Sequence, residues 1–492
     1  MRSSSFLTPF FPPWSARLNA LGRRRRSASP KVRFWRPATL AQIEERFAGA
    51  LPDSLLTQDN PEIFCRERIF TLARTLWCWI WQVLQQNTSC REVVRQVEAL
   101  FALHHAGPVD EGTAAYCKAR SKLPAKLLEV LFGASFQSAE KAAAPTAPQL
   151  LGGRPIRVAD GSGARLADTP DNRADYPPSK SLRAGTGFPY LRLVALFSLT
   201  SGALLAQASG SLHTAELSLW FKLLDQLRPG DIVLADRAYG IYVVIALLQS
   251  RGIDLIHTLP EGSRRIDFRK TRKRLGPSDA LFVWEKPKQP SRFVPAGQWG
   301  PLPGKLTVRV LRARVGKKGF RSKELFLVTT LLDGVQYPAH ELLAAHARRW
   351  RMEMSFDDLK TTLGMESLSC HSPAMIQKEL LVFLIAHNLI RWLLANAAAQ
   401  ENVPTDRLSF KGTLDGFRQW SQAMAQCPKP EERQALWRQL LRTIAADALP
   451  HRPGRQEPRA VKKRSKYPPS QLPPLTIPGP SQSQRTPSCS KR

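Results

Sequence analysis

The pattern of hydrophobic and polar residues changes twice along the chain. Residues 40–133 show helical periodicity. From residue 156, short apolar runs separated by Gly, Pro and polar residues take over, which is typical of strands alternating with helices. Helical periodicity returns between residues 336 and 447. We therefore predict an α/β protein preceded by an N-terminal helical domain.

The central region predicts one specific order of elements. They are a strand at 156–159, hairpin strands at 191–199 and 203–208, a helix at 215–227, a strand at 232–235, a helix at 241–250 and a strand at 253–258. This order is expected of a ribonuclease H-like core, although other α/β folds share it. Residues 260–335 break the alternation, so we predict a basic β-rich insertion there. Its strand-like runs are 280–284, 306–313 and 325–331.

These changes of pattern predict seven segments. They are a basic disordered arm (1–40), a helical DNA-binding domain (41–141), a first part of the ribonuclease H-like core (150–259), the β-rich insertion (260–335), a second part of the core (336–400), a C-terminal helical region (401–450) and a basic Pro-rich tail (451–492). In the helical domain, Thr88 is the predicted N-cap of a helix, although Glu92 has capping-box spacing from Ser89. The basic helix at 113–122 is compatible with DNA binding, and equally with any small helical domain.

A predicted helix at 338–363 carries an unusual polar face. At about 100° per residue, its residues His346, Arg349, Glu353 and Lys360 fall within roughly 60° of one another. An apolar stripe lies beside them, made of Ala345, Met352, Phe356, Leu359 and Leu363. One face therefore packs on a core, and its edge presents a carboxylate between two cations. In isolation this would be an ordinary surface ion pair.

Two aspartates change that interpretation, because Asp160 and Asp236 each follow a short apolar strand. Bringing both together with Glu353 is unfavourable unless a divalent cation is present. Two Mg²⁺ ions, or Mn²⁺ in their place, would suit such oxygen ligands and phosphoryl chemistry. Asp357 is the main rival acid, since it lies near the face of Glu353. The other rivals are Asp168, Asp171, Asp175, Asp231 and Asp358.

The charge of the chain points to a polyanionic partner. The formal net charge is +32, of which the tails at 1–37 and 451–492 supply +18 and the body +14. A basic body favours double-stranded DNA as the partner. No secretory signal is convincing, and the apolar run at 380–394 is read as a buried helix, so we expect no membrane association. Seven scattered cysteines without zinc spacing favour reduced thiols in the cytoplasm.

Several of these stretches carry a resemblance to a known family. Residues 158–162, 168–172, 230–239 and 349–360 resemble bacterial insertion-sequence transposases of the insertion-element-four family, a cut-and-paste group of DDE recombinases. The resemblance covers about residues 60–465. That family's signature is Tyr, two residues, Arg, three residues, Glu, six residues and Lys. Arg349, Glu353 and Lys360 fit it, and His346 stands in the Tyr position.

The resemblance implies roles for single residues. It implies that Asp160, Asp236 and Glu353 bind Mg²⁺ and catalyse strand cleavage. The implied DNA-binding residues are Arg237, His346, Arg349 and Lys360. The family's β insertion also holds a hairpinned DNA end with a Trp on a flipped base, and here Trp284 and Trp299 are the candidates.

The resemblance further implies a transposase that pairs inverted-repeat ends as a homodimer and joins them to target DNA. We expect it in the bacterial cytoplasm, associated with the nucleoid. Two alternatives remain open. One is a catalytically inactive DNA-binding relative, which His346 and the basic tails favour. The other is a metal-dependent nuclease that cuts and never joins.

Overall fold

A computed structural model describes most of the chain between residues 47 and 449. The described residues are 47, 49–51, 69–85, 88–103, 108–180, 186–259, 266–289, 297–315, 323–426 and 429–449. The predicted basic arm and the predicted basic tail both lie outside these residues.

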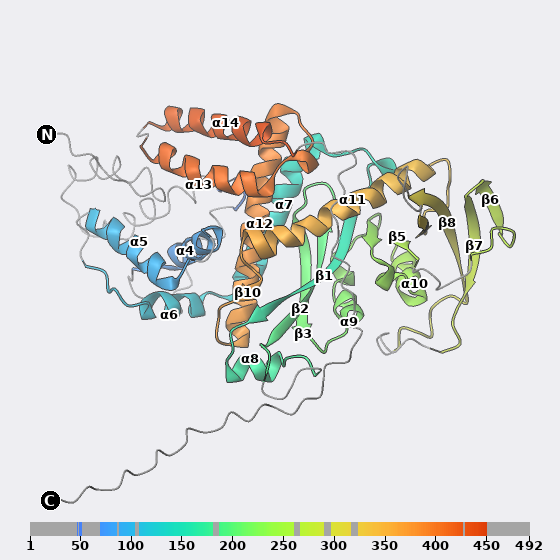
Figure 1. Cartoon of the computed structure of the whole chain (residues 1–492), viewed down its shortest axis with the longest axis horizontal. Helices are drawn as coiled ribbons and strands as arrows, with labels where there is room; N and C mark the ends of the chain where they lie inside the picture. The colour runs from blue at the N-terminus through green and yellow to red at the C-terminus, as the bar shows by residue number, and fades with distance from the viewer. Residues whose placement is uncertain are drawn as a thin grey trace, which may run out of the picture. The chain divides into compact units, whose positions relative to one another are not determined.

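Within the described residues, ten strands join in one sheet (Figure 1). Nine follow the order β3-β2-β1-β4-β5-β9-β8-β7-β6, and β10 pairs with β1. Strands β1 to β3 are antiparallel neighbours, whereas β4 runs parallel to β1 and β5. This is the ribonuclease H-like arrangement, so the predicted core is confirmed. The strands are β1 (Ile156–Leu166), β2 (Tyr190–Ser198), β3 (Leu204–Ser211), β4 (Ile232–Ala235), β5 (Asp254–Thr258), β6 (Lys273–Gly276), β7 (Asp279–Glu285), β8 (Lys305–Val315), β9 (Lys323–Thr329) and β10 (Ser367–Leu368).

The β-rich segment continues the core sheet. Strand β9 pairs antiparallel with β5, so that Ile256 faces Thr329, and β8, β7 and β6 follow outward from β9. Three of these four strands match predicted runs. The sequence analysis missed β6, whose basic residues look like a solvated loop.

Helices cover both faces of the sheet. They are α4 (Leu72–Leu84), α5 (Cys90–Leu103), α6 (Ala114–Lys122), α7 (Ala125–Ala143), α8 (Pro170–Asp175), α9 (Glu216–Phe221), α10 (Tyr242–Ser250), α11 (Ala339–Asp357), α12 (Pro373–Glu401), α13 (Phe410–Gln426) and α14 (Pro430–Ala446). One hydrophobic core joins Val158 and Leu234 of the sheet to α11, α12 and the N-terminal helices. A second core joins Ala159 and Ala235 to α9 and α10 on the opposite face. Successive residues of each strand therefore pack alternately into the two cores, as strand geometry requires.

Helix α12 is the longest helix of the described chain and lies against α7, α4, α13 and α14. By length and composition alone it is apolar enough to cross a membrane, but 83% of its most apolar window is buried inside the structure. Its His387 and Asn388 are fully buried, and the Asn388 amide bonds to the main chain of Leu204. The prediction of a buried core helix is confirmed.

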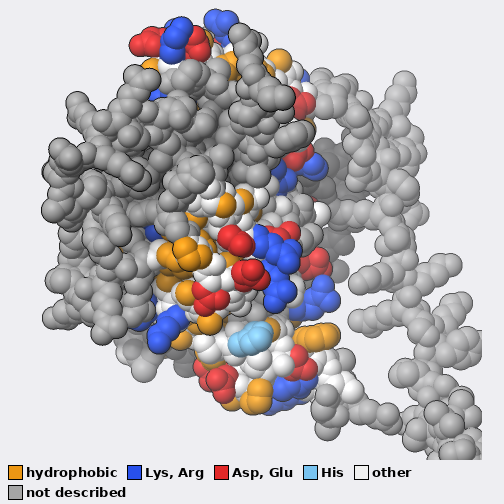
Figure 2. Space-filling view, turned by 90° about the vertical axis from the view of Figure 1, so that its left-hand side faces the viewer, with side chains coloured by type: hydrophobic (Ala, Val, Ile, Leu, Met, Phe, Trp, Pro, Cys, Tyr) orange, Lys and Arg blue, Asp and Glu red, His pale blue; other side chains and the backbone are white. Residues whose placement is uncertain are grey.

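The N-terminal helices correct two sequence-based expectations. The N-cap of α5 is Ser89 rather than Thr88, because Ser89 and Glu92 exchange both capping-box hydrogen bonds. Arg120 of the predicted DNA-binding helix is 5% exposed, with its guanidinium 3.9 Å from the Trp79 ring centroid. It is thus a core residue, and Lys118 is left as an exposed cation of α6. Figure 2 views the side of the molecule that lies on the left in Figure 1, where basic and acidic side chains stand next to each other.

Candidate active site

The register of β1 and β4 brings Asp160 and Asp236 together. The last parallel pair between these strands is Ala159 with Ala235, and each aspartate is the next residue along the chain. Neighbouring strands lie about 4.8 Å apart, so the two residues are direct neighbours. The expectation that β1 ends at Asp160 was wrong, because β1 continues to Leu166 along β2. The strand that ends there is the shorter partner β4.

Both aspartates face α11. Alternation along β1 gives Asp160 the same face as Val158, and along β4 it gives Asp236 the same face as Leu234. Val158 and Leu234 belong to the core that includes Ala345 of α11, and α11 packs against β1 and β5. The predicted third acid therefore comes from the helix that covers this pair.

The main chain orients one oxygen of each carboxylate. Asp160 Oδ1 accepts a hydrogen bond from Gly161 N at 2.8 Å, and Asp236 Oδ1 accepts one from Arg237 N at 2.6 Å. Both aspartates are half-buried. Two adjacent carboxylates that are fixed in this way suit a hard divalent cation, which prefers oxygen ligands. Among the side chains that the structure describes, no three His, Cys, Asp or Glu form a metal-binding group. The Glu353 side chain is not among them.

Two of the predicted DNA-binding residues, Arg237 and His346, lie near Asp236. Arg237 is exposed and directly follows Asp236, while His346 and Arg349 are half-buried on α11. The pKa of His346 is lowered by burial and by the nearby Arg349 charge, against an opposing effect of Asp236. His346 is therefore near both Asp236 and Arg349. Glu353 belongs to the same helix, two turns and about 10 Å beyond His346 along the axis.

Lys360 lies beyond a change of helical geometry. The predicted helix was expected to run regularly to Leu363, but α11 ends at Asp357 and one π-helical turn follows at Asp358–Thr362. Leu363 N bonds to Asp358 O at 2.9 Å, five residues back. A π turn inserts one residue into the helical repeat, so Lys360 is rotated away from the position that a regular helix would give it. Its side chain is half-buried. The apolar stripe is confirmed at Ala345, Phe356, Leu359 and Leu363, and the side chain of Met352 is not described.

The rival acid Asp358 has a structural partner. Arg391 of α12 donates to Asp358 Oδ2 at 2.8 Å and to the Ser355 hydroxyl at 3.1 Å. Burial raises the pKa of Asp358 to about 6 and outweighs the attraction of Arg391. Asp358 thus ties the π turn to α12.

This raised pKa predicts a pH dependence of stability. The folded chain keeps a proton on Asp358 that the unfolded chain has lost between pH 3.8 and about 6. The contribution of this proton to the free energy of unfolding is therefore fully present below pH 3.8 and is lost as the pH rises to about 6. We expect Asp358→Asn to remove this part of the pH dependence. Urea unfolding across that range measures it, and Asp175→Asn, at the exposed last residue of α8, serves as the control. Equal pH slopes in wild type and Asp358→Asn would contradict the prediction.

The remaining rivals lie elsewhere. Asp231 is buried at the start of β4, the end opposite Asp236, with its carboxylate 3.5 Å from Arg157. The other three acids lie in or beside α8 and are exposed. They are Asp168, Asp171 and Asp175. The main rival, Asp357, is exposed as well.

The two candidate tryptophans of the insertion differ in exposure. Trp284 is 6% exposed and belongs to the core on the face of α9 and α10. Trp299 is partly buried against the same core, with the Lys286 ammonium 5.0 Å from its ring centroid. Trp299 is therefore the more exposed of the two.

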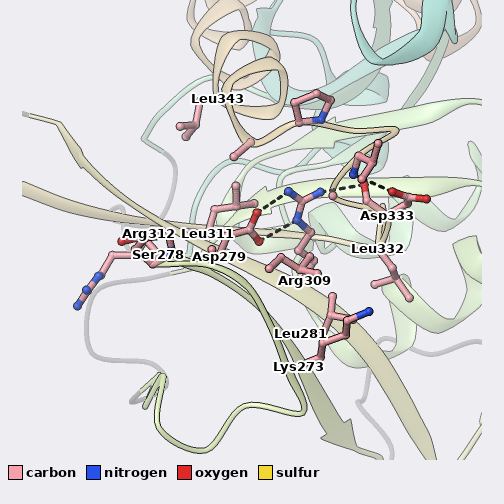
Figure 3. Close-up of a pocket in the computed structure, with 17 residues that line it drawn as sticks. Lys273, Ser278, Asp279, Leu281, Arg309, Leu311, Arg312, Leu332, Asp333 and Leu343 are labelled. Carbon is pink, nitrogen blue, oxygen red and sulfur yellow. Dashed lines mark hydrogen bonds and ion pairs between the residues drawn. The ribbon is translucent and has the colours of Figure 1, made fainter.

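A cavity of about 880 Å³ lies between strands β6 to β8 and the start of α11 (Figure 3). Its wall contains the ion pair of Arg309 with Asp279, and its lining includes Lys273, Arg312 and Leu343. None of the predicted site residues lines this cavity. The candidate active site is thus the edge between β1, β4 and α11.

Sequence reasoning missed two residues behind the aspartate pair. Tyr239 Oη donates a hydrogen bond to Glu216 Oε1 at 2.6 Å. Glu216 is the first residue of α9, where an acid looks like an ordinary helix N-terminal charge. The sequence signal for Glu216 was Gly161, which follows Asp160. A glycine inside a strand often marks a place where another group approaches the backbone closely.

The sequence of the chain is similar to those of known transposases. The sequence profile of the family described as "Transposase DDE domain" matches residues 151–389. Transposase InsG for insertion sequence element IS4, from Escherichia coli K12, is 25% identical over 416 residues, which are 83% of this chain and 89% of InsG. The putative transposase InsZ of the same organism is 27% identical over 228 residues, which are 43% of this chain and 75% of InsZ.

One solved structure also resembles the chain. It is the cryo-EM structure of the piggyBac transposase synaptic complex with hairpin DNA, with a TM-score of 0.41 and 10% identity over 89% of this chain and 92% of that one. The fold assignment rests on the strand order of the sheet.

Proposed function

We propose that this chain is a DDE transposase of the IS4 insertion-sequence family and that it moves an insertion sequence by cut-and-paste transposition. The relative InsG is named as the transposase of such an element. The observation that supports the proposal best is the pairing of Asp160 and Asp236, which directly follow the last residue pair of β1 and β4 and face α11.

In this proposal, Asp160 and Asp236 bind Mg²⁺ together with Glu353, two ions in all, and Mn²⁺ can replace them. When bound, these ions supply charge stabilisation for in-line displacement at phosphorus. The main-chain amides of Gly161 and Arg237 donate hydrogen bonds that orient the carboxylates of Asp160 and Asp236. The proposed third ligand, Glu353, belongs to α11.

The cations near this site hold the DNA backbone in the proposal. Arg237, Arg349 and Lys360 contact phosphates, which fixes the register of the DNA without reading its sequence. His346 replaces the family's Tyr and, with its lowered pKa, acts as a neutral hydrogen-bonding group beside Asp236. A homodimer would pair two inverted-repeat ends and present them to target DNA in the cytoplasm. Trp299 is the proposed stacking partner of a flipped base.

A plasmid assay tests this function and separates it from the two alternatives. The substrate carries the DNA that flanks the gene on both sides of a marker, and the protein is added with Mg²⁺. We expect excision of the marker and its insertion into a second plasmid. Cleavage without insertion would indicate a nuclease. Binding without cleavage would indicate an inactive relative.

A single cation provides a narrower prediction. Arg237→Ala should weaken binding of an end duplex regardless of its sequence and reduce the slope of log binding constant against log salt by about 1. The exposed Lys222, next to α9 on the opposite face of the sheet, is the control when changed to Ala. Filter binding across a salt series measures both slopes. An unchanged slope in Arg237→Ala would remove Arg237 from the proposed interface.

A further inference from the structure

A buried tyrosine and a glutamate lie directly behind the two aspartates, on the face opposite α11. Tyr239 is 1% exposed and donates to Glu216 at 2.6 Å. The Trp220 ring meets Tyr239 edge-on at 5.3 Å and is fully buried. Tyr239 is therefore held on two sides by α9.

Glu216 also presses against β1. A Cβ atom placed on Gly161 would lie 2.5 Å from Glu216 Oε1 and 2.8 Å from its carboxyl carbon. Real Cβ atoms do not approach so closely, so only glycine fits between Asp160 and Ser162 while Glu216 stays in place. The carboxylate thus lies against the backbone of β1 at the residue after Asp160.

Tyr239 contacts the backbone that follows Asp236. The two residues enclose the short 3₁₀ turn η4 (Arg237–Tyr239), whose N-cap is Asp236. Tyr239 N bonds to Asp236 O at 3.1 Å, which closes the turn. The Tyr239–Glu216 bond therefore links α9 to the backbone after Asp236, while the same carboxylate lies against Gly161 after Asp160.

The electrostatics fit this arrangement. A tyrosine hydroxyl is protonated at neutral pH, so it donates to the Glu216 carboxylate. A hydrogen bond to an ionised acceptor is roughly twice as strong as a neutral one, so this link resists distortion.

We propose that Glu216 and Tyr239 are positioning residues that fix the separation of Asp160 and Asp236 and so set the affinity of the site for divalent cations. The inference rests on the proposed function, which assigns those two aspartates to metal binding. Neither positioning residue contacts the cation. They act through Gly161 and through η4.

The test is Mn²⁺ binding to the full chain, measured by the electron paramagnetic resonance of free Mn²⁺ without DNA or turnover. We expect Tyr239→Phe to weaken Mn²⁺ binding by about 10–100-fold, the usual effect of losing a partner that orients a metal ligand. Glu216→Gln keeps an acceptor for the hydroxyl but loses the charge, so we expect a smaller loss. Glu216→Gln also provides the test if Tyr239→Phe fails to fold.

Tyr242→Phe is the matched control. It removes another buried tyrosine hydroxyl bond, to Pro303 O at 2.6 Å, away from the aspartates. We expect it to leave Mn²⁺ affinity unchanged even if the melting temperature falls. Equal Mn²⁺ affinities in Tyr239→Phe, Glu216→Gln and wild type would overturn the inference, while loss of binding in Asp160→Asn would still support the proposed function. Unchanged Mn²⁺ binding in Asp160→Asn would instead overturn the proposed function itself.

Discussion

Asp160→Asn and Asp236→Asn are each expected to reduce DNA strand cleavage below about 1% of the wild-type rate, since even groups that only orient a metal ligand are worth about 10–100-fold. Each change removes one negative charge from a pair of adjacent carboxylates that only a cation can neutralise. Binding of the DNA end should remain nearly intact, because phosphate contacts come from the neighbouring cations. Single-turnover cleavage and filter binding on one end duplex measure both effects.

Asp168→Asn is the control for this result. Asp168 is exposed, forms an ion pair with Arg173 and lies in the polar segment that follows β1. It should cleave at the wild-type rate. The apoproteins of Asp160→Asn and Asp236→Asn should unfold no earlier than wild type, because removing one of two like charges relieves repulsion. A variant of either aspartate that cleaves normally in Mg²⁺ would refute its assignment.

The second large effect concerns stability rather than chemistry. Arg309 is 1% exposed and donates to Asp279 through two nitrogens, with Nε at 2.8 Å, and to the carbonyl oxygens of Asp333 and Tyr337 (Figure 3). Arg309→Ala leaves a poorly solvated carboxylate and two carbonyls without their donor. We expect the free energy of unfolding to fall by about 3–5 kcal/mol, the usual cost of breaking a buried ion pair from one side.

Lys273→Ala tests whether burial is the cause. Lys273 lines the same cavity but is exposed. Its loss should change the free energy of unfolding by no more than about 0.5 kcal/mol. Urea unfolding of both variants gives the comparison. Similar losses in the two would mean that the ion pair does not anchor β8 to the connection before α11.

The ribonuclease H-like core was predictable because its strands are apolar runs that end in unmistakable turn residues. Leu234, Ala235 and Asp236 show this, since the apolar strand β4 stops where the acid begins. The end of β1 was not predictable in the same way. Gly161 and Gly163 look like a turn, yet β1 continues because β2 pairs with it there. Such pairing is a long-range property that the local sequence does not contain.

Shorter elements were missed for different reasons. The start of α8 carried a readable signal, because Thr169 caps the helix and Pro170 is its first residue. The π turn after α11 carried none, since its geometry accompanies a contact between Asp358 and the distant Arg391. Glu216 was missed because its partner Tyr239 is 23 residues away. Sequence reasoning thus found the acids of the candidate site but not the side chains that support them.

The central claim is that Asp160, Asp236 and Glu353 together bind divalent cations. The most direct test is the anomalous scattering of Mn²⁺ in crystals of the protein bound to an end duplex. We predict manganese peaks with carboxylate oxygens of all three residues as ligands. Manganese bound elsewhere, or a Glu353 side chain that points away from both aspartates, would contradict the account.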